Sequence, residues 1–403
     1  MQKFKFIILG AGPTGLSVAH SLIASGVDRQ SILVMEKASV AGGLCRSADV
    51  DGAPLDIGGG HFLDIRNRAV TEFLFRFMPA TEWNRFDRIA KIRIFGQQVD
   101  HPLEANLWQL PAEKQIDFLE GLARNYSAGL DNPVGNFESW IRAKFGDRLA
   151  DDYMLPYNRK IWDLDLNLLG TYWLHKLPSV SFREVLTSCL ERRATGTLPA
   201  HAEFLYPKSH GYGEVWRRMG VALGDALLLD TPASGVDFPT RTVNGRFQAE
   251  YLVNTVPWQS LAKTSDFPPE IASDIASLIH TSVDVDYHPS DAQTNAHWLY
   301  EPNESISYHR ILARQNFCIE SRGFWTETNS RRCLPEAGFR HTNEFAYPVN
   351  TLDKPQAVSR IAAWARGHSV FAAGRWGLWE HMNSDIAVKN GIEVANILIK
   401  EAL

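Results

Sequence analysis

The chain opens with an alternation of strand-like and helix-like apolar patterns. An apolar run over 4–9 is followed at once by the stretch Gly10-Ala11-Gly12-Pro13-Thr14-Gly15. Apolar residues then recur at spacings of three and four up to Gly26, as on one face of a helix that a glycine ends. A second apolar run over 31–35 ends in Glu36. The pattern predicts a strand, a helix and a second strand.

Further along, the pattern changes several times. We expect, in order, a hairpin over 88–102, mainly helices over 103–200, short strands over 204–260 with a buried strand over 251–256, more strands over 281–347, a strand over 369–373 and a helix over 384–400. The clearest amphipathic helix runs from Phe137 to Tyr153, and we expect Pro156 to end it.

The glycine-rich stretch has the context of a dinucleotide-binding turn. It stands between a strand and a helix, and the acidic Glu36 follows its last glycine by about twenty positions. Gly10 permits the tight turn, Gly12 lets the backbone approach a pyrophosphate, and Gly15 allows the helix to pack closely on the strand. Glu36 would accept hydrogen bonds from a ribose diol. The alternative is a glycine turn without a ligand, which this full context disfavours.

A second glycine turn indicates which dinucleotide is bound. The stretch from Lys37 to Leu44 contains Gly42-Gly43, and Gly58-Gly59-Gly60-His61 follows. The first of these resembles the E-K-x-x-x-x-G-G-L stretch of FAD-binding proteins of the glutathione-reductase and amine-oxidase class. We therefore expect FAD as the cofactor.

The expected fold class is α/β: a discontinuous Rossmann-like FAD-binding domain with a helical insertion and an antiparallel β-sheet domain. We divide the chain into three FAD-binding parts, a hairpin of the sheet domain, a helical substrate domain and the main sheet domain. The FAD-binding parts are 1–85, 204–265 and 348–403. The hairpin is 86–102, the helical domain is 103–203 and the sheet domain is 266–347.

The composition limits which binding partners and which cellular compartment we expect. Of the 403 residues, 45% are apolar and 22% charged, and the formal net charge is −5 without a block of like charges. These values favour neither nucleic acid nor an anionic membrane as partner. Four scattered cysteines show no metal-ligand spacing, and no metal is expected. The N-terminal apolar run is too short for a signal peptide and no stretch could span a bilayer, so we expect a cytoplasmic protein.

Several motifs together resemble the flavin-dependent UDP-galactopyranose mutase family, as a divergent member. Their order and spacing match the family along nearly the whole chain. They are Gly59-Gly60-His61, Leu155-Pro156-Tyr157-Asn158-Arg159-Lys160-Ile161-Trp162, Tyr172-Trp173-Leu174, Tyr308-His309-Arg310, Glu344-Phe345-Ala346-Tyr347-Pro348, and Gly374-Arg375-Trp376-Gly377-Leu378-Trp379 with Asn383-Ser384-Asp385.

The resemblance implies an isomerase that uses reduced FAD without net electron transfer. In the family, flavin N5 forms an adduct with the anomeric carbon of a nucleotide-diphosphate sugar, the ring opens, and it recloses as pyranose or furanose. UDP-galactose or a related sugar would be the substrate, in polysaccharide biosynthesis. NAD(P)H or a flavin reductase would supply electrons, and a homodimer is compatible with the family.

The resemblance also implies roles for individual residues. The expected catalytic residues are His61 and Arg375 at the flavin and Arg310 at the diphosphate. The expected cofactor-binding residues are Gly10, Gly12, Thr14, Gly15, Glu36, Lys37, Gly43, Leu44, Gly59, Gly60, His61, Gly374, Arg375 and Asn383. The expected substrate-binding residues are Asn158, Trp162, Arg310, Tyr347 and His381.

The chain departs from the family at the substrate site. The second diphosphate arginine is absent from 173–177, where His175 or Lys176 could replace it. His381 and Phe317 stand where the family has tyrosines, and His101 and Glu104 fall where longer members contact uracil. An imidazole beside a diphosphate would bind more strongly when protonated, so we expect affinity to fall as the pH rises.

Other interpretations stay open at this stage. Trp162 could be a core residue, Tyr347 could end a strand, Arg310 could be a solvated charge, and Cys45 could fill space behind its turn. A surface position is the default for His101, His175 and His201. The whole protein could instead be an FAD-dependent oxidoreductase of the amine-oxidase type, or an FAD-holding protein that binds a nucleotide sugar without converting it.

Overall fold

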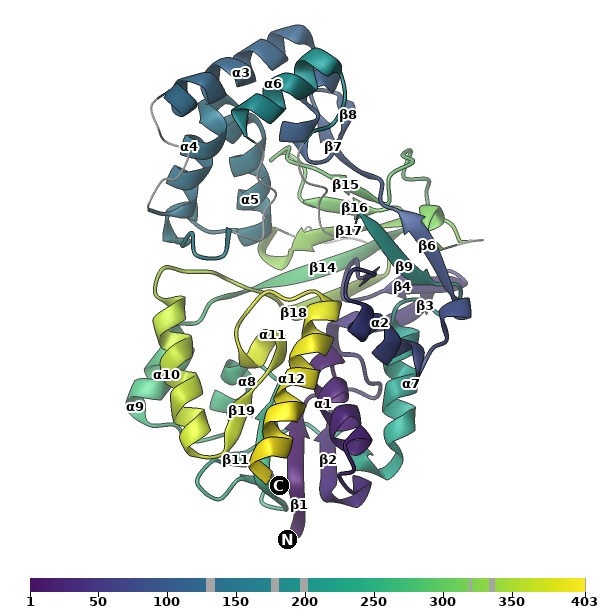
Figure 1. Cartoon of the computed structure of the whole chain (residues 1–403), viewed down its shortest axis with the longest axis vertical. Coiled ribbons are helices and arrows are strands. Elements are labelled where there is room, and N and C mark those ends of the chain that lie inside the picture. Colours follow the sequence, from purple (N-terminus) through teal and green to yellow (C-terminus); the bar gives the residue numbers. More distant parts are fainter. Residues whose placement is uncertain (128–134, 175–180, 196–201, 319–320, 333–337, 403) are drawn as a thin grey trace.

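The structure is a computed structural model. A seven-stranded sheet, built from segments that are far apart in the sequence, lies in the lower half of the molecule in Figure 1. The structure describes the chain except for 128–134, 175–180, 196–201, 319–320, 333–337 and residue 403. The strand order is β10 (Leu227–Leu228), β2 (Ile32–Met35), β1 (Gln2–Leu9), β13 (Phe247–Asn254), β12 (Thr242–Val243) and β11 (Val236–Asp237), with β19 (Val370–Ala372) also on β13. The strands β10, β2, β1, β13 and β19 pair in parallel.

Helices cover both faces of this sheet, which explains why β1 is apolar on both sides. Phe6 and Ile8 belong to one core cluster and Ile7 to another, and all three are fully buried. Successive strand residues point to opposite faces, so each face needs its own cover. The helices are α1 (Pro13–Ala24), α7 (Gly213–Leu223) and α12 (Ser384–Ala402), which pack together, and α8 (Trp258–Ala262), α9 (Pro269–Ser277) and α10 (Lys354–Gly367), which form a second group.

A second seven-stranded sheet crosses the middle of the molecule (Figure 1). It has the order β18 (Arg340–Pro348), β14 (His280–His288), β17 (Phe324–Asn329), β16 (Arg310–Leu312), β15 (Trp298–Tyr300), β7 (Ala90–Ile94) and β8 (Gln97–Asp100). It is antiparallel apart from the pair β15 and β7. The predicted hairpin is the pair β7 and β8. Smaller sheets join β3 (Ser47–Val50) to β4 (Ala53–Asp56), and β5 (Leu63–Asp64) through β9 (Glu203–Pro207) to β6 (Trp83–Asp87).

A helical region with its own apolar core lies above the second sheet in Figure 1. It contains α3 (Ala112–Ser127), α4 (Phe137–Leu149), α5 (Leu155–Trp162) and α6 (Phe182–Glu191), while α2 (Arg68–Phe75) belongs to the lower half. The mixed α/β fold class predicted from the sequence is confirmed.

Two predictions about helices were wrong. Pro156 does not end a helix: it stands in the first turn of α5, where the missing N–H of proline costs no hydrogen bond. A π-helical turn over Ala150–Met154 joins α4 to α5. The segment 204–260 was expected to hold short strands, but it also contains α7, whose buried face packs on α1.

Candidate functional site

A cavity of about 650 Å³ lies at the carboxyl end of β1 and β2, between the two large sheets. Ten of the fourteen residues expected to bind the cofactor line it: Gly10, Gly12, Thr14, Glu36, Lys37, Gly43, Leu44, His61, Gly374 and Arg375. The other four, Gly15, Gly59, Gly60 and Asn383, stand next in the chain to lining residues or within the same turns. Ligands of open α/β sheets bind at this edge.

Two helices direct their N-termini at this cavity. Pro13 and Thr14 begin α1, Ser384 begins α12, and all three line the cavity. The Thr14 hydroxyl donates to the Ala387 carbonyl oxygen over 3.0 Å, which joins the two helix starts directly. Free N–H groups and the helix dipoles make such a place favourable for anions.

The glycines of the first turn serve two different needs. A Cβ at Gly15 would lie 2.0 Å from the Gly10 carbonyl oxygen, so α1 can approach β1 only at a glycine. A Cβ at Gly12 would meet no protein atom closer than the Gly43 Cα at 3.9 Å. Packing within the chain therefore does not require glycine at 12, and the added atom would enter the cavity instead.

Glu36 is held at the cavity wall as a hydrogen-bond acceptor. Its side chain is buried, and its two carboxylate oxygens accept the N–H groups of Ala11 over 2.8 Å and Ala38 over 3.0 Å. Each carboxylate oxygen has further lone pairs, so a ribose diol could still be bound.

His61 and Arg375 also line the cavity. The His61 Nδ1 lies 3.0 Å from the Gly59 carbonyl oxygen, and its ring stacks over Tyr212 at 6.4 Å. Arg375 donates from Nη1 to the Ala346 carbonyl oxygen over 2.8 Å and from Nη2 to that of Met382 over 2.5 Å. Burial lowers the pKa of Arg375, yet an arginine keeps its charge in proteins. The lining of the cavity thus offers a hydrogen-bond acceptor, Glu36, and a fixed cation, Arg375, as a bound anionic dinucleotide would require.

Tyr347 connects four other residues expected at the site. Its hydroxyl lies 3.5 Å from Arg310 Nη2, and the Arg375 guanidinium lies over its ring at 5.8 Å. Ring centroids of His381 and Trp162 lie 5.4 and 6.4 Å from that of Tyr347. We call these five residues the Tyr347 cluster. It continues from the cavity through Arg375, so the structure brings the expected substrate-binding residues together beside the cavity.

Arg310 is not the solvated charge that one interpretation allowed. Its side chain is 17% exposed and forms an ion pair with buried Glu327, whose Oε2 accepts from Nε over 3.1 Å and also from Nη2. These contacts use the edge of the guanidinium that Nε and Nη2 form, and Nη1 lies on the other edge.

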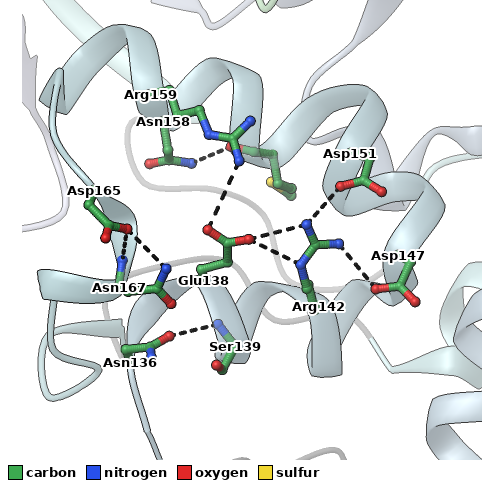
Figure 2. A network of polar contacts seen from close by, with 11 residues as sticks. Asn136, Glu138, Ser139, Arg142, Asp147, Asp151, Asn158, Arg159, Asp165 and Asn167 are labelled. Atoms are coloured by element: carbon green, nitrogen blue, oxygen red, sulfur yellow. Dashed lines mark hydrogen bonds and ion pairs between the residues drawn. The ribbon is translucent and has the colours of Figure 1, made fainter.

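Asn158 is engaged within its own helix. Its amide nitrogen donates to the Met154 carbonyl oxygen over 2.8 Å, and its amide oxygen accepts from the Trp162 indole over 3.2 Å. Figure 2 shows this residue at the edge of a polar network that joins α5 to α4. Glu138 lies between Arg142 and Arg159, at 3.1 and 4.0 Å, and Arg142 also contacts Asp151 over 2.9 Å. The network holds the helix that presents Asn158 and Trp162.

Of the residues that depart from the family, His381 lies in the Tyr347 cluster, and the others lie away from it or outside the described chain. Phe317 is buried in an aromatic core beside Tyr206 at 4.9 Å. The surface assignment of His101 was wrong, because its ring lies 4.9 Å from that of Tyr300 and burial lowers its pKa to about 3. Glu104 is 4% exposed, and burial raises its pKa to about 7. The calls on His175, Lys176 and His201 fall outside the described residues.

Sequence reasoning missed several polar residues at the site, among them three with charged or titratable side chains. Arg46 and His341 line the cavity, and Glu327 pairs with Arg310. Arg46 follows the second glycine turn directly and could have been found from that position. His341 and Glu327 stand on strands, where only the pairing of distant segments brings them to the site.

Comparisons with known proteins agree with this geometry. Residues 8–77 match the family of NAD(P)-binding Rossmann-like domains. A solved structure of reduced UDP-galactopyranose mutase covers 100% of this chain and 95% of its own, with a TM-score of 0.88 and 22% identity. The chain has the UDP-galactopyranose mutase fold. A cyclohexylamine oxidase from Brevibacterium oxydans shares this fold less closely, with a TM-score of 0.66 and 16% identity over 99% of both chains.

Two curated relatives each match a part of this chain. The UDP-galactopyranose mutase of Mycoplasma pneumoniae is 25% identical over 192 residues, which are 41% of this chain and 42% of that protein. The match therefore spans less than half of that relative. An uncharacterized protein in the nifH2 3′ region of Methanothermococcus thermolithotrophicus is 34% identical over 98 residues, 22% of this chain and 92% of that protein. The chain belongs to the same family as that uncharacterized protein.

No helix among the described residues is both long enough and apolar enough to cross a bilayer. The expected cytoplasmic location, the homodimer and the role in polysaccharide biosynthesis stay predictions.

Proposed function

We propose that this protein is a flavin-dependent isomerase that interconverts the pyranose and furanose forms of a nucleotide-diphosphate sugar, UDP-galactose or a related sugar. The observation that carries the proposal is the continuity of the dinucleotide cavity with the Tyr347 cluster. Arg375 lines the cavity and lies over the Tyr347 ring, and Tyr347 in turn reaches Arg310. A polar, aromatic and cationic surface at this point suits a diphosphate sugar better than an apolar substrate.

The cofactor in this proposal is FAD, bound without a covalent link. Gly12 and the start of α1 would take the pyrophosphate, Glu36 the ribose, and Arg375 with the start of α12 the flavin ring. When bound in its reduced form, FAD supplies a nucleophilic nitrogen, N5, for the anomeric carbon of the sugar. NAD(P)H or a flavin reductase would keep it reduced.

Residues of the Tyr347 cluster would bind and orient the substrate. The Nη1 edge of Arg310 and the Tyr347 hydroxyl would hold the diphosphate, since charge-assisted hydrogen bonds to phosphate are the strong ones. Trp162, which is 8% exposed, would pack on the sugar and exclude water. Asn158 would orient Trp162 through its hydrogen bond to the indole.

The two rival functions, an amine oxidase and a binding protein without activity, require different things of the same residues. An amine oxidase would have to admit a protonated amine beside the guanidinium of Arg375, which repels it. A protein that only binds the nucleotide sugar would have the same cavity and the same Tyr347 cluster, but it would not convert the sugar.

The deciding experiment compares the reduced and the oxidised holoprotein with UDP-galactose. We expect furanose formation, followed by chromatography of the nucleotide sugars, from dithionite-reduced protein and none from the oxidised form. Equal rates from both forms would contradict the flavin chemistry. Binding without conversion would support the binding protein, and amine-dependent reduction of the oxidised flavin would support the oxidase.

A further inference from the structure

One buried carboxylate joins two parts of the candidate site. Glu327 lies on β17 directly opposite Arg310 of β16 and is 1% exposed. Its Oε2 accepts from the Arg310 guanidinium, and its Oε1 accepts the Gly60 N–H over 2.8 Å. The two oxygens therefore hold two segments far apart in the sequence.

The turn on the Oε1 side is shaped around this carboxylate. A Cβ at Gly59 would lie 2.7 Å from Glu327 Oε1, and the φ of +97° at Gly59 is one that side chains other than glycine rarely adopt. His61 follows this turn, lines the cavity, and contacts the Gly59 carbonyl oxygen. The position of His61 in the cavity wall thus depends on a turn that Glu327 fixes.

The charge of Glu327 is balanced by Arg310. Other titratable side chains close to it include Tyr347 and His309, and the His309 Nε2 lies 3.8 Å from Oε2. Burial lowers the pKa of His309 well below its ordinary value, with smaller contributions from Arg310 and Lys160, so this ring stays neutral. Removing one partner of a buried ion pair leaves an uncompensated charge.

We propose that Glu327 is a positioning residue, and that its charge balance with Arg310 sets the electrostatic environment of the cofactor at the His61 turn. The proposal rests on the flavin part of the proposed function and not on the isomerase reaction. It also implies that a diphosphate bound at Arg310 affects the flavin. An anion there changes the charge balance between Arg310 and Glu327.

The test is a double-mutant cycle read by the reduction midpoint potential of the bound flavin, without substrate. Glu327→Gln removes a negative charge but keeps an acceptor for the Gly60 N–H, and we expect a more positive potential, since an anionic reduced flavin is then favoured. Arg310→Gln should shift the potential to a more negative value. The double variant should return close to the potential of the native protein, because both charges are gone.

Asp286→Asn is the matched control. Asp286 forms a cross-strand ion pair with Arg340 in the same sheet, over 2.5 and 2.9 Å, and is 7% exposed. Neither residue lines the cavity, so this variant should keep the native potential. A purely structural role for Glu327 predicts shifts of the same sign in both single variants, and a double variant whose potential stays away from the native value; either would overturn the proposal.

The cycle stays decisive if a single variant does not retain flavin. The double variant buries no unpaired charge and should then regain flavin, and its failure to do so would overturn the charge balance. A protein that shows the expected cycle but no turnover of UDP-galactose would contradict the isomerase and leave the role of Glu327 intact.

Discussion

At the scale of single residues, Glu104 is a buried acid with an unsatisfied oxygen. It lies in the short helical turn Leu103–Ala105 above the second sheet, and its Oε2 has no hydrogen-bond partner among the described residues. Burial raises its pKa from an ordinary 4.5 to about 7. The folded protein therefore retains a proton there that the unfolded chain loses, so stability should fall as the pH rises from about 4.5 to 7 and then level off.

Glu104→Gln should remove this dependence. We expect the variant to gain roughly 1–3 kcal/mol of unfolding free energy relative to the native protein between pH 5 and pH 8, measured by urea denaturation. The exposed Glu113→Gln on α3 is the control and should show no such gain. An equal effect of Glu104→Gln at both values of pH would mean that the carboxyl is already ionised at pH 5.

His381 carries the second prediction at this scale. Its ring lies 5.4 Å from that of Tyr347, within the Tyr347 cluster. A diphosphate bound there favours the protonated imidazole, so affinity for UDP-galactose should be highest on the acid side of neutrality and weaken as the pH rises. Titration calorimetry from pH 6 to 9 should show this slope in the native protein and a flatter profile in His381→Phe. Parallel profiles would place His381 outside the diphosphate site.

At the scale of elements, the close packing of α1 on β1 is the most sensitive contact of the dinucleotide unit. Gly15→Ala would place a methyl group 2.0 Å from the Gly10 carbonyl oxygen and force the helix away from the strand. We expect a loss of about 1–3 kcal/mol in unfolding free energy, together with weaker retention of flavin. Gly367→Ala at the end of α10 adds the same group into open space and should be neutral in both measurements.

How far the sequence predicts the site depends on the distance along the chain between contacting residues. Gly10, Gly12 and Glu36 act within one strand–helix–strand unit, and local spacing was sufficient to place them at the cavity. Glu327 reaches Gly60 across 267 positions and lies opposite Arg310 through the register of β17 against β16, and no local pattern encodes either contact. Tyr347 could be expected at the substrate only through the family resemblance, and its contacts with Arg310 and His381 required the fold.

At the scale of the whole molecule, the cavity wall is assembled from the N-terminal unit, the segment after β13, strand β18 and the start of α12. A ligand that binds only this assembled form stabilises the fold by mass action. Removal of flavin should therefore lower the melting temperature, and added FAD should raise it again in a concentration-dependent way, as scanning fluorimetry would show. FMN lacks the adenylate half and should restore much less. Equal rescue by both would contradict the use of Glu36 and the first glycine turn.

The hydroxyl contact between Thr14 and Ala387 has a consequence for synthesis of the protein. The two residues are 373 positions apart, so the partner of Thr14 is synthesised long after Thr14 itself. At a rate of roughly 5–20 residues per second, the nascent N-terminal unit waits for tens of seconds with its cofactor wall incomplete. Cofactor loading should therefore follow synthesis of the segment that contains Ala387, and in cells short of riboflavin the chains without cofactor should be the form that proteases remove.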